Sequence, residues 1–183
     1  DRVIEIKEQP SYEGQTLITQ SVGMDADAHV LSLALAESGK INLVSLQYID
    51  FRAAKDEDPE IKEQGILKTS ESLSLAGADA NTRGILVGQD WYFVVGNKVY
   101  TSPVLKPQLA DLTTLPDDLG VPVAVAVSSK ETHLIIATYD AGSSHENKGS
   151  FALVDLTTKE VKVHRNVMGK CVVAKGYDAN PWF

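Results

Sequence analysis

The residues best suited to contact a ligand lie in one polar segment, residues 140–149, which joins two apolar runs and is rich in glycine and serine. The segment is longer than a minimal hairpin turn, and loops of this kind often carry binding residues on a rigid scaffold. Its carboxylate, imidazole, hydroxyl and amide groups are able to bind a sugar or a polar protein surface; a plain hairpin tip is the alternative. The candidate ligand-binding residues are Asp140, Ser143, His145, Glu146 and Asn147.

A metal site is not assigned, and neither is a cofactor. Adjacent residues of an extended segment point to opposite sides, so His145 and Glu146 make an awkward pair of ligands. Asp25 and Asp27 stand at alternate positions, as in calcium loops, but the following residues lack the further oxygen ligands and the glycine that such loops require. A solvated turn is therefore the expected role of these two aspartates.

The signature motifs of common enzymes do not occur in the sequence, which has no phosphate-binding loop, HExxH, GxSxG or paired CxxC. No catalytic residue is assigned on this basis. A carboxylate-dependent glycan-active enzyme, a glycosidase or lyase, is the alternative, because glycoside hydrolysis needs two carboxyl groups roughly 5–10 Å apart across the sugar. The carboxylates available for such a pair are Asp25, Asp27, Asp90, Asp117, Asp118 and Asp140.

The histidines that precede apolar runs and the lone cysteine favour structural roles. His29 and His133 occupy equivalent places, which fits a repeated turn better than a shared metal. Cys171 is the single cysteine, so it forms no internal disulfide, and it lies in an apolar run where a small buried side chain is its usual role. A catalytic thiol would need a histidine beside it, and the sequence does not place one there.

Composition and charge describe a folded, acidic domain. The chain has 183 residues, of which 43% are hydrophobic and 23% charged, with a formal net charge of −8. This length suits one domain, residues 1–183, with a real core. The acidic balance and scattered basic residues argue against nucleic acid or an anionic membrane surface as a partner. No apolar run approaches the ~20 residues of a membrane span, and the start at Asp1 indicates a piece of a longer chain.

Hydrophobic periodicity predicts strands almost everywhere, because apolar residues form short runs or alternate with polar ones between turn residues. Residues 59–67 are the best candidate for a helix, with an irregular loop as the alternative, and residues 106–112 suit at most one helical turn. Gly96 and Asn97 suit a tight hairpin turn. The expected strands cover residues 3–7, 16–23, 29–36, 41–49, 72–76, 84–87, 91–95, 98–101, 123–127, 133–139, 150–155, 160–164 and 171–175.

Three regions repeat one order of strand, polar turn, long apolar strand, turn and further strand, with the long second strands beginning at His29, Trp91 and His133. A period of ~40–50 residues with about four short strands is typical of β-propellers. The second strands are apolar on both sides, as expected where sheets stack, so Trp91 and Phe93 should be buried on one face and Tyr92 on the other. The expected fold is all-β, a propeller-like stack of about three to four blades, with a β-sandwich as runner-up.

The later half of the chain, residues 84–178, carries motifs that point to a known family. They are GNKVY at 96–100, ATYD at 137–140, GSFALVD at 149–155 and GKCVV at 169–173. With them the chain resembles the C-terminal propeller-like region of Bacteroidetes PKD-like family surface lipoproteins. The resemblance implies a periplasmic or cell-surface location and a link to carbohydrate uptake, and it implies no catalytic residues.

The sequence therefore predicts a non-enzymatic, extracytoplasmic domain that binds a glycan or a protein partner through loops held on a rigid scaffold. A surface-assembly module that self-associates through exposed blade edges is a further interpretation. The glycosidase or lyase remains the alternative from another class.

Overall fold

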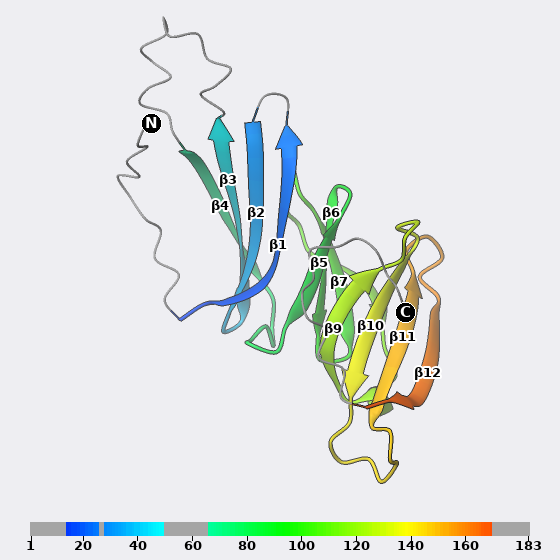
Figure 1. The fold of residues 1–183 in the computed structure, drawn as a ribbon. Helices are drawn as coiled ribbons and strands as arrows, with labels where there is room; N and C mark the ends of the chain where they lie inside the picture. Colours follow the sequence, from blue (N-terminus) through cyan, green and yellow to red (C-terminus); the bar gives the residue numbers. More distant parts are fainter. Residues whose placement is uncertain (1–13, 26–27, 50–65, 170–183) are drawn as a thin grey trace, which may run out of the picture.

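A computed structural model describes residues 14–25, 28–49 and 66–169, and within them the chain is built from strands and one 3-10 turn, η2 (Asp117–Leu119). The predicted all-β class is confirmed. The strands form three four-stranded antiparallel sheets, and in each sheet strands adjacent in the chain are hydrogen-bonded neighbours (Figure 1).

Each sheet is a meander of consecutive strands. Sheet 1 contains β1 (Thr16–Asp25), β2 (Ala28–Glu37), β3 (Lys40–Ile49) and β4 (Ile66–Ser74). Sheet 2 contains β5 (Arg83–Val87), β6 (Asp90–Val95), β7 (Lys98–Pro103) and β8 (Ala110–Thr114). Sheet 3 contains β9 (Val121–Val127), β10 (His133–Tyr139), β11 (Gly149–Asp155) and β12 (Val161–Met168).

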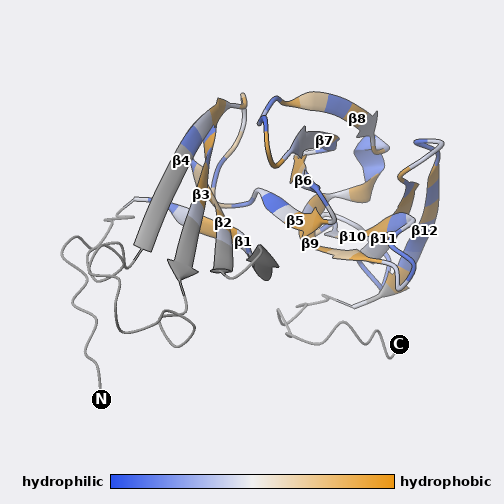
Figure 2. Cartoon of the chain, turned by 90° about the horizontal axis from the view of Figure 1, so that it is seen from above, coloured by the Kyte–Doolittle hydropathy of each residue, from blue (hydrophilic) through white to orange (hydrophobic). Residues whose placement is uncertain are grey.

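The sheets lie side by side, with sheet 2 between the other two (Figure 2). Their first strands adjoin, because β1 contacts β5 and β5 contacts β9. The last strand of each sheet, β4, β8 or β12, lies at the opposite edge of its sheet. The three long stretches that begin at His29, Trp91 and His133 are the second strands β2, β6 and β10, each in a separate sheet.

The first core fills the space between sheets 1 and 2. Ile18, Ala34 and Ile41 from sheet 1 are buried against Trp91 and Phe93 from β6. The ring centroids of Trp91 and Phe93 are 6.1 Å apart, and the planes of the two rings are nearly parallel. Because alternate residues of a strand face opposite sides, Tyr92 between them points away from this core.

Gly84 of β5 is closely surrounded by its neighbour strand β6 and by Ile18 of sheet 1. A Cβ atom at this position would lie 2.8 Å from both the Cδ1 atom of Phe93 and the carbonyl oxygen of Tyr92, and 3.0 Å from Cγ2 of Ile18. These separations are shorter than van der Waals contact, so the packing at this point requires a residue without a side chain.

The second core fills the space between sheets 2 and 3. Tyr92 and Val94 from β6 face Leu134 and Ile136 from β10, and the two β10 side chains are fully buried. Sheet 2 therefore packs both of its faces, one against each neighbour, which explains why β6 is apolar on both sides. The predicted division of Trp91, Tyr92 and Phe93 between two faces is confirmed.

Arg83, at the start of β5, connects sheet 2 to sheet 3 through its guanidinium group. Its Nε donates a hydrogen bond to the carbonyl oxygen of Val123 in β9 at 3.0 Å. Its Nη1 donates to the carbonyl oxygens of Ala80 and Thr82, each at 3.0 Å. The Arg83 side chain thus links two parts of the chain. One is the connection between sheets 1 and 2, and the other is β9, the first strand of sheet 3.

Most of the expected strands are present, with two corrections. The helical turn expected at residues 106–112 is wrong, because the chain there is extended and enters β8, a strand that the sequence pattern missed. The strand expected at 72–76 begins earlier, at Ile66, so residues 66–67 of the candidate helix are in β4, while 59–65 lie outside the described residues. The strands expected at 3–7 and 171–175 also lie outside them.

Candidate functional site

The five candidate ligand-binding residues lie in the connection between β10 and β11, residues 140–148, which projects below sheet 3 in Figure 1. The strands leading into it are paired up to Tyr139 and Gly149. The connections from sheet 1 to sheet 2 and from sheet 2 to sheet 3 lie at this same end of the sheets, because each follows a fourth strand and precedes a first strand. The loop is the longest strand connection within sheets 2 and 3.

Hydrogen bonds within the loop hold its base closed. The backbone N–H of Asp140 donates to the carbonyl oxygen of Lys148 at 3.0 Å, and the N–H of Ser143 donates to that of Asp140 at 3.2 Å. The Asp140 carboxylate accepts a bond from the N–H of Gly142 at 2.9 Å, as in an Asx turn. Across the loop, Nζ of Lys148 donates to the carbonyl oxygen of Ala141 at 3.0 Å.

The loop divides into a braced base and an exposed tip. Ser143 accepts a hydrogen bond on Oγ from the N–H of His145 at 3.2 Å, so Ser143 and Asp140 both fix the backbone. The side chains of His145, Glu146 and Asn147 are exposed to solvent. An imidazole, a carboxylate and an amide therefore stand together at the tip, where they can donate and accept hydrogen bonds to a polar ligand.

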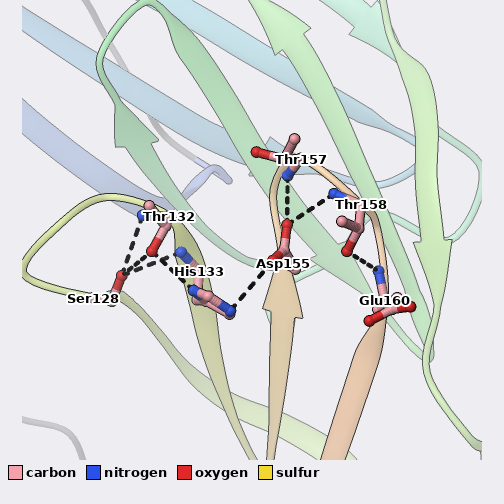
Figure 3. A network of polar contacts seen from close by, with 7 residues as sticks. All are labelled: Ser128, Thr132, His133, Asp155, Thr157, Thr158 and Glu160. Atoms are coloured by element: carbon pink, nitrogen blue, oxygen red, sulfur yellow. Dashed lines mark hydrogen bonds and ion pairs between the residues drawn. The ribbon is translucent and has the colours of Figure 1, made fainter.

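A second polar cluster lies at the opposite end of sheet 3, between the turns β9–β10 and β11–β12 (Figure 3). One oxygen of the Asp155 carboxylate accepts hydrogen bonds from the N–H groups of Thr157 and Thr158, each at 2.8 Å. The other oxygen lies 3.5 Å from Nε2 of His133. These two turn N–H groups, followed by the charge of His133, hold the pKa of Asp155 below its ordinary value.

The neighbouring turn is fixed around Ser128. Its Oγ accepts hydrogen bonds from the N–H groups of Thr132 and His133, at 3.2 and 3.1 Å. The hydroxyl of Thr132 lies 2.9 Å from Nδ1 of His133, and the N–H of Leu156 donates to the carbonyl oxygen of Thr132 at 3.0 Å. The Thr132 hydroxyl, the His133 imidazole and the Asp155 carboxylate thus stand in one row that joins the two turns to each other, and the carboxylate also closes its own turn.

The carboxylates proposed for an enzyme are spread over several elements. Asp118 forms an exposed bidentate ion pair with Arg165 of β12, at 2.9 and 3.0 Å, which lowers the pKa of the carboxyl. The neighbouring Asp117 accepts a hydrogen bond from Asn97. Asp140 caps the loop turn as described above, and Asp90 begins β6. Asp25 ends β1, where no side chain is described, and Asp27 lies outside the described residues.

The histidines and the cysteine are placed as follows. His29 and His133 lie at or next to the first residue of β2 and β10, the second strands of their sheets. The prediction that the two histidines occupy equivalent positions in the repeat is therefore confirmed for the backbone. His29 pairs in register with Met24 and Tyr48. Cys171 lies outside the described residues.

Within residues 14–25, 28–49 and 66–169, no cluster of three or more His, Cys, Asp or Glu side chains is placed to hold a metal ion. In the same residues, no helix is long and apolar enough to cross a membrane.

The sequence did not indicate that Asp155 and Arg83 fix turns and connections, and it offered Asp118 as a catalytic carboxylate without its ion pair to Arg165. A signal existed for Asp155, because an aspartate directly before Leu-Thr-Thr at the end of an apolar strand is a common start of an Asx turn. No signal existed for the two arginine contacts, since each joins positions at least 40 residues apart.

Comparison of the chain with models of known protein families and with curated proteins gives no match. The function is therefore argued from the residues and geometry of this chain, together with the resemblance described above.

Proposed function

We propose that the three sheets are consecutive blades of a β-propeller and that the protein is a non-enzymatic binding domain. Support for the propeller comes from the repeated meander, the face-to-face packing of sheet 2 on both neighbours and the adjoining first strands. In a propeller the first strands lie around the central axis and the loops of one end form the usual binding surface. The proposal takes residues 1–183 as one domain of a longer chain.

The observation that carries the binding role is the construction of loop 140–148. Its base is closed by hydrogen bonds within the loop, whereas His145, Glu146 and Asn147 at its tip are exposed. A loop with a fixed backbone loses little conformational entropy when a ligand binds, which favours affinity. The tip offers donors and acceptors at close spacing, as the hydroxyl groups of a sugar require.

A glycan is the ligand class that we propose, with a polar protein surface as the second choice. The tip groups are an imidazole, a carboxylate and an amide, which both donate and accept hydrogen bonds. The chain as a whole carries a formal charge of −8, which disfavours a polyanion as the ligand. In line with the resemblance to surface lipoproteins, the proposal places the domain in the periplasm or on the outer-membrane surface. Asp140 and Ser143 act mainly by holding the tip in position.

A glycan array probed with the purified chain tests the proposal. The triple variant His145→Ala, Glu146→Ala, Asn147→Ala should lose at least tenfold in binding while its thermal unfolding stays unchanged, because the three side chains are exposed. The control is Ser129→Ala with Lys130→Ala, two exposed positions in the β9–β10 turn at the opposite end of sheet 3.

Equal binding by the triple variant and the wild type would refute the role of the tip. Release of new reducing ends from any bound glycan, abolished in Asp140→Asn but not in the tip variant, would instead establish the glycosidase or lyase alternative.

A further inference from the structure

The face of sheet 3 that points away from sheet 2, here called the outer face of sheet 3, is apolar at its centre. Ile135 lies between Leu134 and Ile136, which are fully buried in the second core, so its side chain points to the other side of the sheet. Leu153 pairs with Ile135, and Phe151 lies two residues before Leu153 on the same face of β11. All three outer side chains are half-buried, and none belongs to either of the two cores that the described residues form. In the described part of the chain, no fourth sheet packs on this face.

Sheet 1 also has an apolar face that points away from sheet 2, here called the outer face of sheet 1. Ala34 and Ala36 of β2 belong to the first core, so Leu33 and Leu35 point to the other side of the sheet. Leu17 of β1 pairs with Leu35 and lies on the same face. Leu35 is buried and Leu33 is half-buried, whereas Leu17 is 41% exposed. The outer face of sheet 1 is therefore open to solvent at its first strand.

The first strand of sheet 3 exposes an apolar side chain as well. Val121 begins β9 and is 60% exposed. It pairs with Tyr139, which lies on the same face of β10 as Ile135 because alternate residues of a strand share a face. In the two interfaces that the structure describes, the first strands adjoin, β1 with β5 and β5 with β9. A sheet that continued the stack beyond sheet 3 would thus place its own first strand beside β9 and Val121.

The two outer faces correspond to faces that already pack on each other inside the chain. All three sheets are meanders with the same strand order, and consecutive sheets pack face to face. The outer face of sheet 3 is equivalent to the face that sheet 2 turns toward sheet 3. The outer face of sheet 1 is equivalent to the face that sheet 2 turns toward sheet 1. A contact between the two outer faces would therefore repeat the interface that joins consecutive sheets, and a second copy of the chain is able to supply it.

The number of sheets indicates how many copies such a contact would join. The described residues form three sheets, and β-propellers typically have about 4–8 blades. Two copies supply six sheets, which lies within this range, whereas one copy supplies three and three copies supply nine. A contact between two different faces closes into a ring when the rotation between copies allows it, and otherwise continues as a filament. In a ring of two copies, both outer faces of each copy are covered.

We propose that two copies of the chain form one closed ring of six sheets. The outer face of sheet 3 in each copy packs on the outer face of sheet 1 in the other, and β9 of one copy adjoins β1 of the other. Val121 and Leu17, which are both exposed in the single chain, then cover each other across the contact. The proposal rests on the propeller arrangement proposed above and does not involve the tip of loop 140–148.

Sedimentation equilibrium of the purified full chain tests the proposal, and the wild type should be a dimer. Leu17→Glu and Val121→Lys each place a charge at an exposed position, so thermal unfolding should show that both variants fold. Each variant alone should weaken the dimer by at least about tenfold, because an unpaired charge is buried in the contact. The matched control is Leu105→Glu, since Leu105 is 85% exposed in the connection between β7 and β8 and lies on neither outer face. The control should dimerise like the wild type.

Mixing the two variants in equal amounts provides a second measurement. In a mixed dimer one contact keeps both native residues, and the other brings the two new charges, which have opposite signs, together. The mixture should therefore regain the dimer that each variant alone has lost.

A monomeric wild type would overturn the proposal, and so would filaments in place of dimers. A dimer through two copies of the same face would be insensitive to one of the variants and would not be restored by mixing, which would also overturn it. None of these results affects glycan binding by the loop tip, so the dimer and the binding role fail separately.

Discussion

Replacing Gly84 with alanine tests how closely β5 packs against its neighbour strand β6 and against Ile18 of sheet 1. The new Cβ would approach Cδ1 of Phe93 and the carbonyl oxygen of Tyr92 to 2.8 Å. The ring can turn slightly, but the carbonyl belongs to the adjoining strand β6 and is fixed by the pairing of Gly84 with Phe93 and of Ile85 with Tyr92. The backbone of β5 therefore has to move by several tenths of an ångström away from its position.

The expected loss of stability follows from two opposing contributions. Overpacking of a close-packed core costs about 1–3 kcal/mol, while removal of a glycine from the unfolded chain stabilises by about 0.4–1 kcal/mol. The net effect is a destabilisation of ~1–2 kcal/mol, which lowers the Tm of a chain of this size by about 2–8 °C.

Urea unfolding followed by the fluorescence of buried Trp91 measures this change. Gly142→Ala is the matched control, because its Cβ would meet no atom closer than 3.4 Å, and its stability should stay within about 0.5 kcal/mol of the wild type. Equal or higher stability of Gly84→Ala would refute the close packing of β5 around Gly84.

The remaining predictions concern the contacts that fix sheet 3. Arg83→Met should destabilise by about 1–3 kcal/mol in the same urea assay, because it leaves three carbonyl oxygens without their donor; an unchanged midpoint would contradict this role. Gly120→Ala should cost more than Gly84→Ala, since the residue has a φ of +79° and its Cβ would overlap the backbone of Tyr139; thermal unfolding compares the two. The pKa of Asp155 is lowered in the folded state from its ordinary value of 3.8, so its stabilisation is present above about pH 4 and is lost as the pH falls through the lowered value. Asp155→Asn should therefore flatten the acid limb of a stability–pH curve, and a limb identical to that of the wild type would show that the carboxylate charge contributes nothing.

The strands could be predicted where apolar runs end at glycine or aspartate. β6 and β7 follow directly from the pattern around Gly96, whose φ of +58° is the conformation that a tight hairpin turn needs. The repeated order also predicts the three second strands, β2, β6 and β10. These features depend on residues adjacent in the chain, so local sequence is sufficient to specify them.

β8 could not be predicted in the same way. Three of its five residues, ADLTT, are polar, and none of the five is fully buried. As the last strand of sheet 2 it needs little hydrophobic signal, since β7 provides its hydrogen bonds on one side. The sequence pattern of residues 106–112 is compatible with one helical turn, but β8 begins at Ala110.

The candidate loop could be located from sequence, but the separate roles of its residues could not. Asp140, Ser143 and His145 are all polar and close in the chain, so the sequence alone does not separate their roles. Asp140 and Ser143 accept hydrogen bonds from the N–H groups of Gly142 and His145, and only these bonds show that the two side chains fix the backbone of the loop. The direction of a side chain in an irregular loop depends on dihedral angles that residue type alone does not determine.

Packing on both faces gives sheet 2 a different local stability from its neighbours. An amide of β6 can exchange with deuterated water only after the sheets on both sides have separated, whereas amides of β4 or β12 can be released by fraying of an outer edge. Because each sheet is stabilised chiefly by the sheets beside it, unfolding should proceed inward, as in proteins built from nearest-neighbour repeats. Among the residues that the structure describes, the slowest-exchanging backbone amides should therefore be those of Tyr92, Phe93 and Val94, in the sheet with a neighbour on each face.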